Sequence, residues 1–183
     1  MKPLAVARRY ARALADVAGE KDSAGLEKIA VELLLVAEVM HAEPALLRFF
    51  DDPSVPQEKK DGLLATLGRK AKIGERTGRF LRLLVARRRL GAIGTIARAF
   101  EAIKDERLGI VPVEATTAIA LKGADLKRFS DSLEKMTGRS VRLKMKVDAG
   151  VLGGARTRIG AKIYDGTLRR RLAMLRERLA PAR

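Results

Sequence analysis

The first hundred residues repeat apolar positions every three or four residues, which is the period of an amphipathic α-helix. Glycine or proline breaks this pattern at Gly19, Pro44, Pro53, Pro56 and Gly74. The pattern predicts helices over residues 4–18, 23–41, 44–50 and 56–67, a fifth one after Gly74 and a sixth over 93–103. Six short amphipathic helices predict a helical bundle.

The period changes near Gly109. Residues 110–117 favour an extended strand, and a helix follows over 124–136. Apolar and basic residues then alternate over 141–147, and a similar alternation covers 157–163. We expect these two segments to form a hairpin around the turn at 148–150. A last helix, capped by Thr167, places Leu168, Leu172, Leu175 and Leu179 on one seam.

These elements predict an α+β protein with two domains. The expected division is an all-helical N-terminal six-helix bundle over residues 1–105 and a small C-terminal mixed domain, with a β-sheet and helices, over 106–183. Aromatic residues make up only 4% of the chain and tryptophan is absent, so small aliphatic side chains must fill the interior. Such a composition favours helical packing.

The charge is unevenly distributed. The net charge is +16, and residues 139–183, with 13 basic and 3 acidic side chains, carry +10 of it. An excess of this kind suits an acidic partner, a nucleic acid or an anionic lipid surface. The longest apolar run, over 33–37, is much shorter than the roughly 20 residues that span a bilayer. We expect no direct membrane insertion.

Catalytic, cofactor-binding and metal-binding residues are not predicted. The chain has no cysteine and one histidine, His41, which has no nucleophile motif beside it. Asp51 and Asp52 precede a proline and fit a helix stop and turn better than a cation site. The glycines at 150, 153 and 154 lie between predicted strands, where turns are expected, and they match no phosphate-binding motif.

With no catalytic, cofactor or metal site predicted, two features remain that could bind a macromolecular partner. The basic runs at 87–89 and 169–171 leave a nucleic-acid-binding protein as the alternative function, although the second half offers only Phe129 and Tyr164 as stacking platforms. The leucine seam of the last helix either packs back onto the hairpin or receives a partner helix. The pattern alone does not choose between these two.

Several segments together resemble a known family. These are the start at 6–14, the stretch 80–90, and above all the blocks 138–154 and 159–168. In this order and spacing they are similar to the delta subunit of F-type ATP synthase, the oligomycin-sensitivity-conferring protein family. Arg87-Arg88-Arg89-Leu90 departs from the Asn-x-Arg-Leu run that is usual there, and Thr167 replaces a serine.

The resemblance implies a non-catalytic stator subunit of the peripheral stalk, which takes part in proton-driven ATP synthesis. It implies no cofactor, no nucleic acid, and a peripheral location on the cytoplasmic face of a bacterial plasma membrane. The N-terminal bundle is expected to bind alpha subunits of the catalytic head, and the C-terminal domain to bind the b-type stalk subunit.

The resemblance also suggests contact residues. Family members bind the alpha helix on the first and fifth helices, and the matching positions here are Tyr10, Ala13, Leu14, Leu83 and Leu84. For the stalk contact we expect the last helix to contribute Leu168, Leu172, Leu175 and Leu179, with Arg169 and Arg176 steering an acidic partner.

Overall fold

The computed structural model describes residues 3–19 and 22–179, and the side chains of residues 4–19 and 22–175. The chain divides into two compact units, Met1–Leu108 and Gly109–Arg183. The division expected between residues 105 and 106 falls inside a helix, because the last helix of the first unit continues to Arg107.

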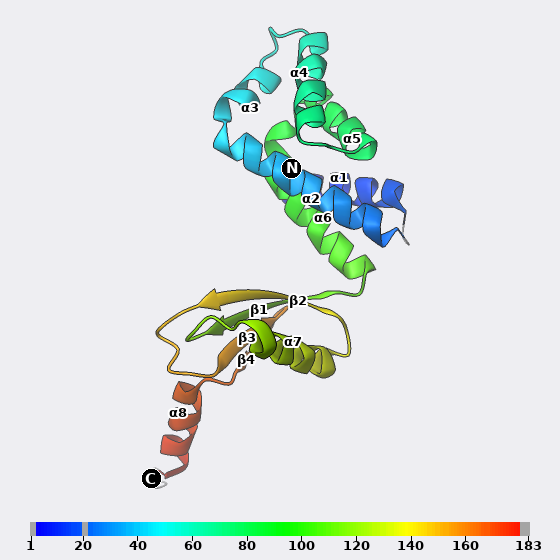
Figure 1. Cartoon of the computed structure of the whole chain (residues 1–183). Coiled ribbons are helices and arrows are strands. Elements are labelled where there is room, and N and C mark those ends of the chain that lie inside the picture. The colour runs from blue at the N-terminus through cyan, green and yellow to red at the C-terminus, as the bar shows by residue number, and fades with distance from the viewer. Residues whose placement is uncertain (1–2, 20–21, 180–183) are drawn as a thin grey trace. The chain divides into compact units, whose positions relative to one another are not determined.

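The N-terminal unit is all-helical, as predicted (Figure 1). Its elements are α1 (Pro3–Ala18), α2 (Ser23–Ala42), α3 (Pro44–Asp51), α4 (Gln57–Lys70), α5 (Glu75–Ala86), the 3-10 turn η1 (Leu90–Ala92) and α6 (Ile93–Arg107). Helices α1, α2 and α6 pack side by side, whereas α4 packs mainly against α5 and α3 against α2 and η1. The arrangement therefore differs from a clean six-helix bundle.

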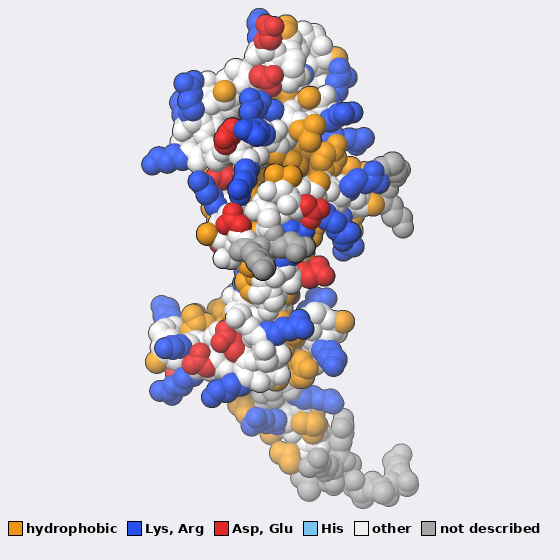
Figure 2. Space-filling model, turned by 90° about the vertical axis from the view of Figure 1, so that its right-hand side faces the viewer, with side chains coloured by type: hydrophobic (Ala, Val, Ile, Leu, Met, Phe, Trp, Pro, Cys, Tyr) orange, Lys and Arg blue, Asp and Glu red, His pale blue; other side chains and the backbone are white. Residues whose placement is uncertain are grey.

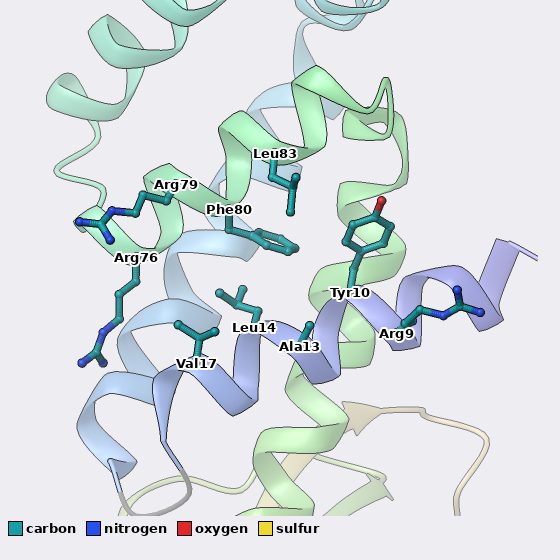
Figure 3. Close-up of a pocket in the computed structure, with 9 residues that line it drawn as sticks. All are labelled: Arg9, Tyr10, Ala13, Leu14, Val17, Arg76, Arg79, Phe80 and Leu83. Carbon is teal, nitrogen blue, oxygen red and sulfur yellow. The ribbon is translucent and has the colours of Figure 1, made fainter.

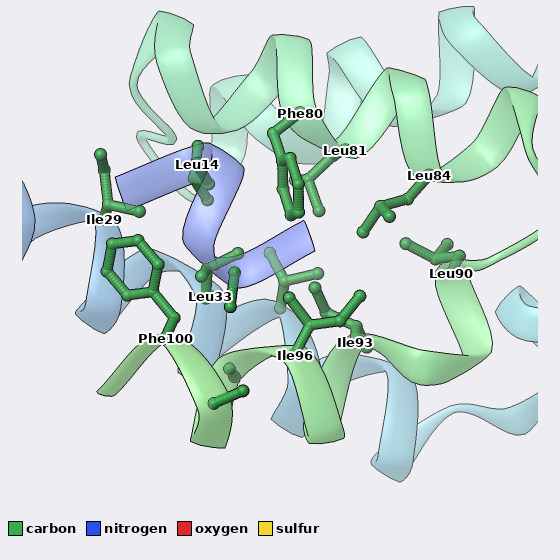
Figure 4. Close-up of a cluster of buried hydrophobic side chains, with 14 of the residues drawn as sticks. Leu14, Ile29, Leu33, Phe80, Leu81, Leu84, Leu90, Ile93, Ile96 and Phe100 are labelled. Atoms are coloured by element: carbon green, nitrogen blue, oxygen red, sulfur yellow. The ribbon is translucent and has the colours of Figure 1, made fainter. Parts of the chain in front are cut away.

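One apolar core holds this unit together. Figure 4 shows side chains from α1, α2, α5 and α6 meeting in it, with Phe100 and Leu33 among the fully buried ones. Ala7, Ala11 and Ala15 recur every turn of α1 and are completely buried, so their small side chains allow close helix packing. Asp22 caps α2 by accepting a hydrogen bond from the Gly25 amide at 2.8 Å.

The C-terminal unit is a four-stranded mixed sheet with two helices. Its elements are β1 (Val111–Thr117), α7 (Gly123–Thr137), β2 (Val141–Val147), β3 (Ala155–Ile159), β4 (Lys162–Asp165) and α8 (Leu168–Leu179). The strand order is β2-β1-β3-β4, with β1 and β2 parallel and the other pairs antiparallel. Eight α-helices are thus present in the described part of the chain, six of them in the N-terminal unit.

The predicted hairpin of 141–147 with 157–163 is wrong in two respects. First, β1 lies between β2 and β3, so the two segments do not pair with each other. Second, the chain turns at Gly160, whose φ of 58° suits glycine, and residues 162–165 fold back as β4. The parallel pairing of β1 with β2 through α7 is a non-local contact that strand alternation does not reveal.

The two faces of the sheet differ as the alternation predicted. Val113, Ala115 and Thr157 are buried on one face, and α7 packs against β2. The opposite face carries the alternate residues of β2 and β3, which are Arg142, Lys144, Lys146, Arg156 and Arg158. The predicted basic face of β2 is therefore confirmed, and β3 extends it.

Candidate functional site

A surface groove of about 490 Å³ runs between α1 and α5 (Figure 3). Its walls are two amphipathic helices, and the lining between them is mostly apolar. Its lining residues are Arg9, Tyr10, Ala13, Leu14, Val17, Arg76, Arg79, Phe80 and Leu83. The volume and the mostly apolar lining suit one face of a partner helix better than a small polar substrate.

The groove has a fixed floor and an exposed rim. Leu14 and Phe80 are almost fully buried, and the rings of Tyr10 and Phe80 pack edge to face with centroids 6.3 Å apart. Val17 and Leu83, in contrast, remain 69% and 45% exposed. Exposed aliphatic side chains beside a preformed floor offer a partner apolar area at little reorganisation cost.

The structure brings together four of the five residues expected to contact the head. Tyr10, Ala13, Leu14 and Leu83 line the groove, whereas Leu84 points into the core and is completely buried. Sequence reasoning missed Val17 and Phe80, and also the rim arginines. The signal was available, because residues 76, 80 and 83 follow the helical spacing of one face of α5.

The rim is basic. Arg76 forms an ion pair with Asp22 at 3.0 Å, and Arg79 pairs with Glu75. The pKa of Asp22 lies below its usual value, mainly because its carboxylate accepts the Gly25 backbone hydrogen bond and secondly because of Arg76. Arg9 makes no ion pair with the described side chains. An acidic flank on the partner would complement this rim.

A buried carboxylate holds the α5 wall in place. Glu32 of α2 is 7% exposed; it accepts a 2.8 Å hydrogen bond from the Gly74 amide and a second one from the Thr77 hydroxyl. These donors belong to the start of α5, where the first amides lack intrahelical partners. Glu32 therefore fixes where α5 begins relative to α2.

A further apolar hollow of about 340 Å³ lies among α2, α4 and α5. Leu35 and Val39 form part of its lining and are partly exposed, and Leu64 and Leu81 lie deeper. Figure 2 shows hydrophobic side chains gathering on the surface of the N-terminal unit, with Lys and Arg side chains around them. The unit thus has more apolar surface than its α1–α5 groove alone.

Helix α8 presents its leucine seam to solvent. Leu168, Leu172 and Leu175 are 48%, 60% and 53% exposed, and Arg169 is also exposed. Thr167 caps the helix as predicted, through a 3.3 Å hydrogen bond from the Arg170 amide. The described leucines do not pack onto the sheet, so the partner-helix hypothesis accounts for them better. The side chains of Arg176 and Leu179 lie outside the described residues.

Other candidate residues form no site. His41 lies exposed at the end of α2, and Asp52 accepts hydrogen bonds from the amide and hydroxyl of Ser54 in a turn. These two hydrogen bonds lower the pKa of Asp52. Within the described residues, no group of three or more potential ligands could hold a metal ion. No helix of the described residues has the length and apolarity needed to cross a membrane.

A helical unit with an apolar groove, followed by a mixed-sheet unit ending in an exposed leucine helix, is typical of proteins that bind other polypeptides and not of enzymes with a polar active-site cleft. The comparisons with known proteins give the family. The family described as ATP synthase delta (OSCP) subunit matches residues 6–179. The chain belongs to this family, whose members are structural subunits of the peripheral stalk and not the catalytic subunits of the complex.

The relatives cover nearly the whole chain. ATP synthase subunit delta of Chlorobium phaeovibrioides is 36% identical over 180 residues, which are 98% of this chain and 97% of that protein. The subunit delta of Desulforamulus reducens is 38% identical over 176 residues, or 96% and 95%. A chain in the Toxoplasma gondii mitochondrial ATP synthase hexamer shares the fold, with a TM-score of 0.66 at 24% identity and coverage of 96% and 98%.

Proposed function

We propose that this stalk subunit fastens the catalytic head to the b-type stalk through two separate surfaces. Its N-terminal unit binds the N-terminal helix of an alpha subunit in the α1–α5 groove, and its C-terminal unit binds the end of the b-type subunit on α8. The observation that carries the proposal is the pairing of an apolar groove of helix dimensions with an exposed leucine seam, one in each unit. Family membership supports this function over the nucleic-acid alternative.

The mechanical role follows from the chemistry of these surfaces. Neither contains a catalytic constellation, so the contribution of the chain is a connection that resists the torque of the rotor. Two separate contacts distribute the load, and each must dissociate slowly, a property governed by well-packed apolar anchors. We place the subunit on the cytoplasmic face of the membrane as a peripheral component of the complex.

The head contact can be tested with the full chain and a synthetic peptide of the alpha N-terminus. Leu83→Asp puts a charge into the groove and is expected to weaken binding at least 100-fold, because an unpaired carboxylate would be buried. Val31→Asp is the matched control, since Val31 is an exposed aliphatic residue of α2 that lines neither described hollow. Equal losses in the two variants, measured by calorimetry, would refute the groove as the site.

The stalk contact needs a parallel test with the soluble part of the b-type subunit. Leu172→Asp is expected to abolish copurification, whereas Ile119→Asp, at an exposed aliphatic residue of the same unit, retains it. Retention by both variants would remove α8 from the contact. Each variant should keep its partner at the other unit, which shows that the chain is still folded.

A further inference from the structure

A second groove, of about 470 Å³, lies between α1 and α6 and has a different character from the α1–α5 groove. Its apolar lining consists of Leu4, Ala99, Ala102 and Ile103, and its charged lining of Arg8, Arg12, Arg98 and Glu106. Arg8 and Arg12 are one helical turn apart, on a different face of α1 from Tyr10 and Leu14. Three guanidinium groups, against the single carboxylate of Glu106, therefore line the groove around a small apolar floor.

These arginines have no acidic partner among the side chains that the structure describes. Arg8, Arg12 and Arg98 are exposed, and none forms an ion pair with the described side chains, whereas Arg107 of the neighbouring helix turn pairs with Asp16. Like charges four residues apart destabilise a helix, so the folded chain gains nothing from the Arg8 and Arg12 pair by itself. Guanidinium groups bind carboxylates in a planar, two-point geometry. A partner that supplies carboxylates would therefore complement these three arginines.

We propose that the α1–α6 groove binds an acidic polypeptide segment with carboxylates about one helical turn apart and a small apolar side chain between them. The apolar residue contacts the floor near Ala99 and Ile103, and the carboxylates meet the three arginines. This contact is additional to the head and stalk contacts described above. It assigns a partner of defined chemistry to a surface outside the α1–α5 groove.

A polypeptide fits this groove better than other anions do. A flat bilayer would touch the walls of a hollow between two helices but not its floor. No aromatic residue lines the groove, so nucleic-acid bases have no ring on which to stack. An apolar floor next to guanidinium groups instead suits an acidic amphipathic segment.

The two grooves adjoin over the outer face of α1. The surface between them is lined by Leu4, Ala5, Arg8, Arg9, Arg12, Ala13 and Asp16. Arg9 and Ala13 also line the α1–α5 groove, and Leu4, Arg8 and Arg12 also line the α1–α6 groove. When a helix is bound in the α1–α5 groove, an acidic segment next to that helix can therefore reach the α1–α6 groove. This simultaneous binding is the part of the inference that rests on the proposed function.

The test uses the full chain and a fluorescent 18-residue helical peptide with glutamates four residues apart and alanines between them, which offers no large apolar side chain to the α1–α5 groove. The variant R8Q/R12Q/R98Q should bind this probe about tenfold more weakly, as expected for the loss of three solvent-exposed charge pairs. The control R82Q/R87Q/R89Q removes the same charge from exposed positions outside the described grooves and should change affinity less than about twofold. Anisotropy titrations at fixed salt measure both.

Two further arms keep the outcome decisive. R8E/R12E should lose the acidic probe and gain affinity for a peptide with lysines in place of the glutamates, which a merely unfolded variant could not do. Leu83→Asp should leave probe affinity unchanged, so failure of the head contact and failure of this proposal are distinguishable. If the two triple variants lose the same amount of affinity for the acidic probe, the proposal is overturned. It is also overturned if R8Q/R12Q/R98Q lowers the affinity for anionic vesicles or single-stranded DNA as much as it lowers the affinity for the probe.

Discussion

The two units use their apolar residues in opposite ways. Among the described side chains, the N-terminal unit buries 23 hydrophobic residues in one cluster, whereas the C-terminal unit buries four, Val113, Ala115, Leu133 and Val151. The large exposed hydrophobic residues show the reverse, with six in the first unit and ten in the second. The smaller unit therefore holds much of its apolar surface outside its core.

This difference assigns the two units different physical roles. A well-filled core makes the α1–α5 groove a preformed site, so partner binding there costs little ordering. The C-terminal unit has less burial to offset its conformational entropy, and a bound partner that covers α8 would add stability as well as contact. The N-terminal unit is thus expected to be stable alone and the C-terminal unit to depend more on its partner.

The largest expected effect breaks the N-terminal core. Phe100→Ala removes a completely buried ring and should cost about 3–5 kcal/mol of unfolding free energy, because a cavity is added to the lost transfer energy. Leu172→Ala, at a 60% exposed position of α8, should change the stability of the isolated chain by less than about 0.5 kcal/mol. Urea unfolding followed by circular dichroism compares the two. Similar losses would contradict the contrast between the units.

The sequence predicts much of this contrast, and its failures have physical causes. The helical period locates α1 to α6 because each has a continuous apolar stripe, and alternation locates β2 with its basic face. The period cannot choose between Leu83 and Leu84, since neighbouring positions on α5 are apolar and only the packed neighbours decide that Leu84 is buried. Likewise, β1 enters the sheet between β2 and β3 through a non-local pairing.

The second prediction concerns partner-dependent stability. A saturating b-type partner should stabilise the C-terminal unit by about 2.7 kcal/mol at 100 times its dissociation constant. Hydrogen exchange should then slow in α8 and in the sheet, while amides of α2 and α6 keep their rates. An alpha N-terminal peptide at the same relative concentration is the matched control and should protect α1 and α5 instead. If the alpha peptide protects α8 and the b-type partner does not, the proposed assignment of the two partners to the two units is reversed.

The third prediction concerns the support of the groove. Glu32→Ala leaves the Gly74 amide and the Thr77 hydroxyl without their acceptor and should cost about 1–3 kcal/mol. Because these donors start α5, affinity for the alpha peptide should fall as well. Glu38→Ala removes an exposed carboxylate from the same helix and should change neither quantity measurably. If Glu32→Ala lowers stability but leaves groove affinity intact, the positioning role is wrong.

The smallest expected effect concerns the first turns of α2 and α8, one in each unit, and their stability at low pH. The pKa of Asp165 lies below its usual value, chiefly because its carboxylate accepts the Thr167 hydroxyl hydrogen bond, and then because of the Thr167 amide and Arg156. The folded state thus favours the ionised form, so its stabilisation is present above the ordinary carboxyl pKa of about 4 and is lost as pH falls through the lower folded value.

The pKa of Asp22 is lowered in the same direction by the backbone of Gly25, so acid removes a cap from α2 as well. The consequences should differ, because α2 is anchored by Leu26 and Leu33 in the core, whereas α8 exposes its seam. As the pH falls from about 4 through the lower folded pKa of each carboxyl, the first turn of α8 should fray and the first turn of α2 should stay protected in amide exchange measurements. Asp165→Asn should make the protection factor of the first α8 turn, which is the intrinsic exchange rate at each pH divided by the measured rate, independent of pH in this range, with Asp125→Asn as the control. If both helices fray equally, anchoring of α2 in the core does not protect its first turn, and the contrast between the two units is wrong.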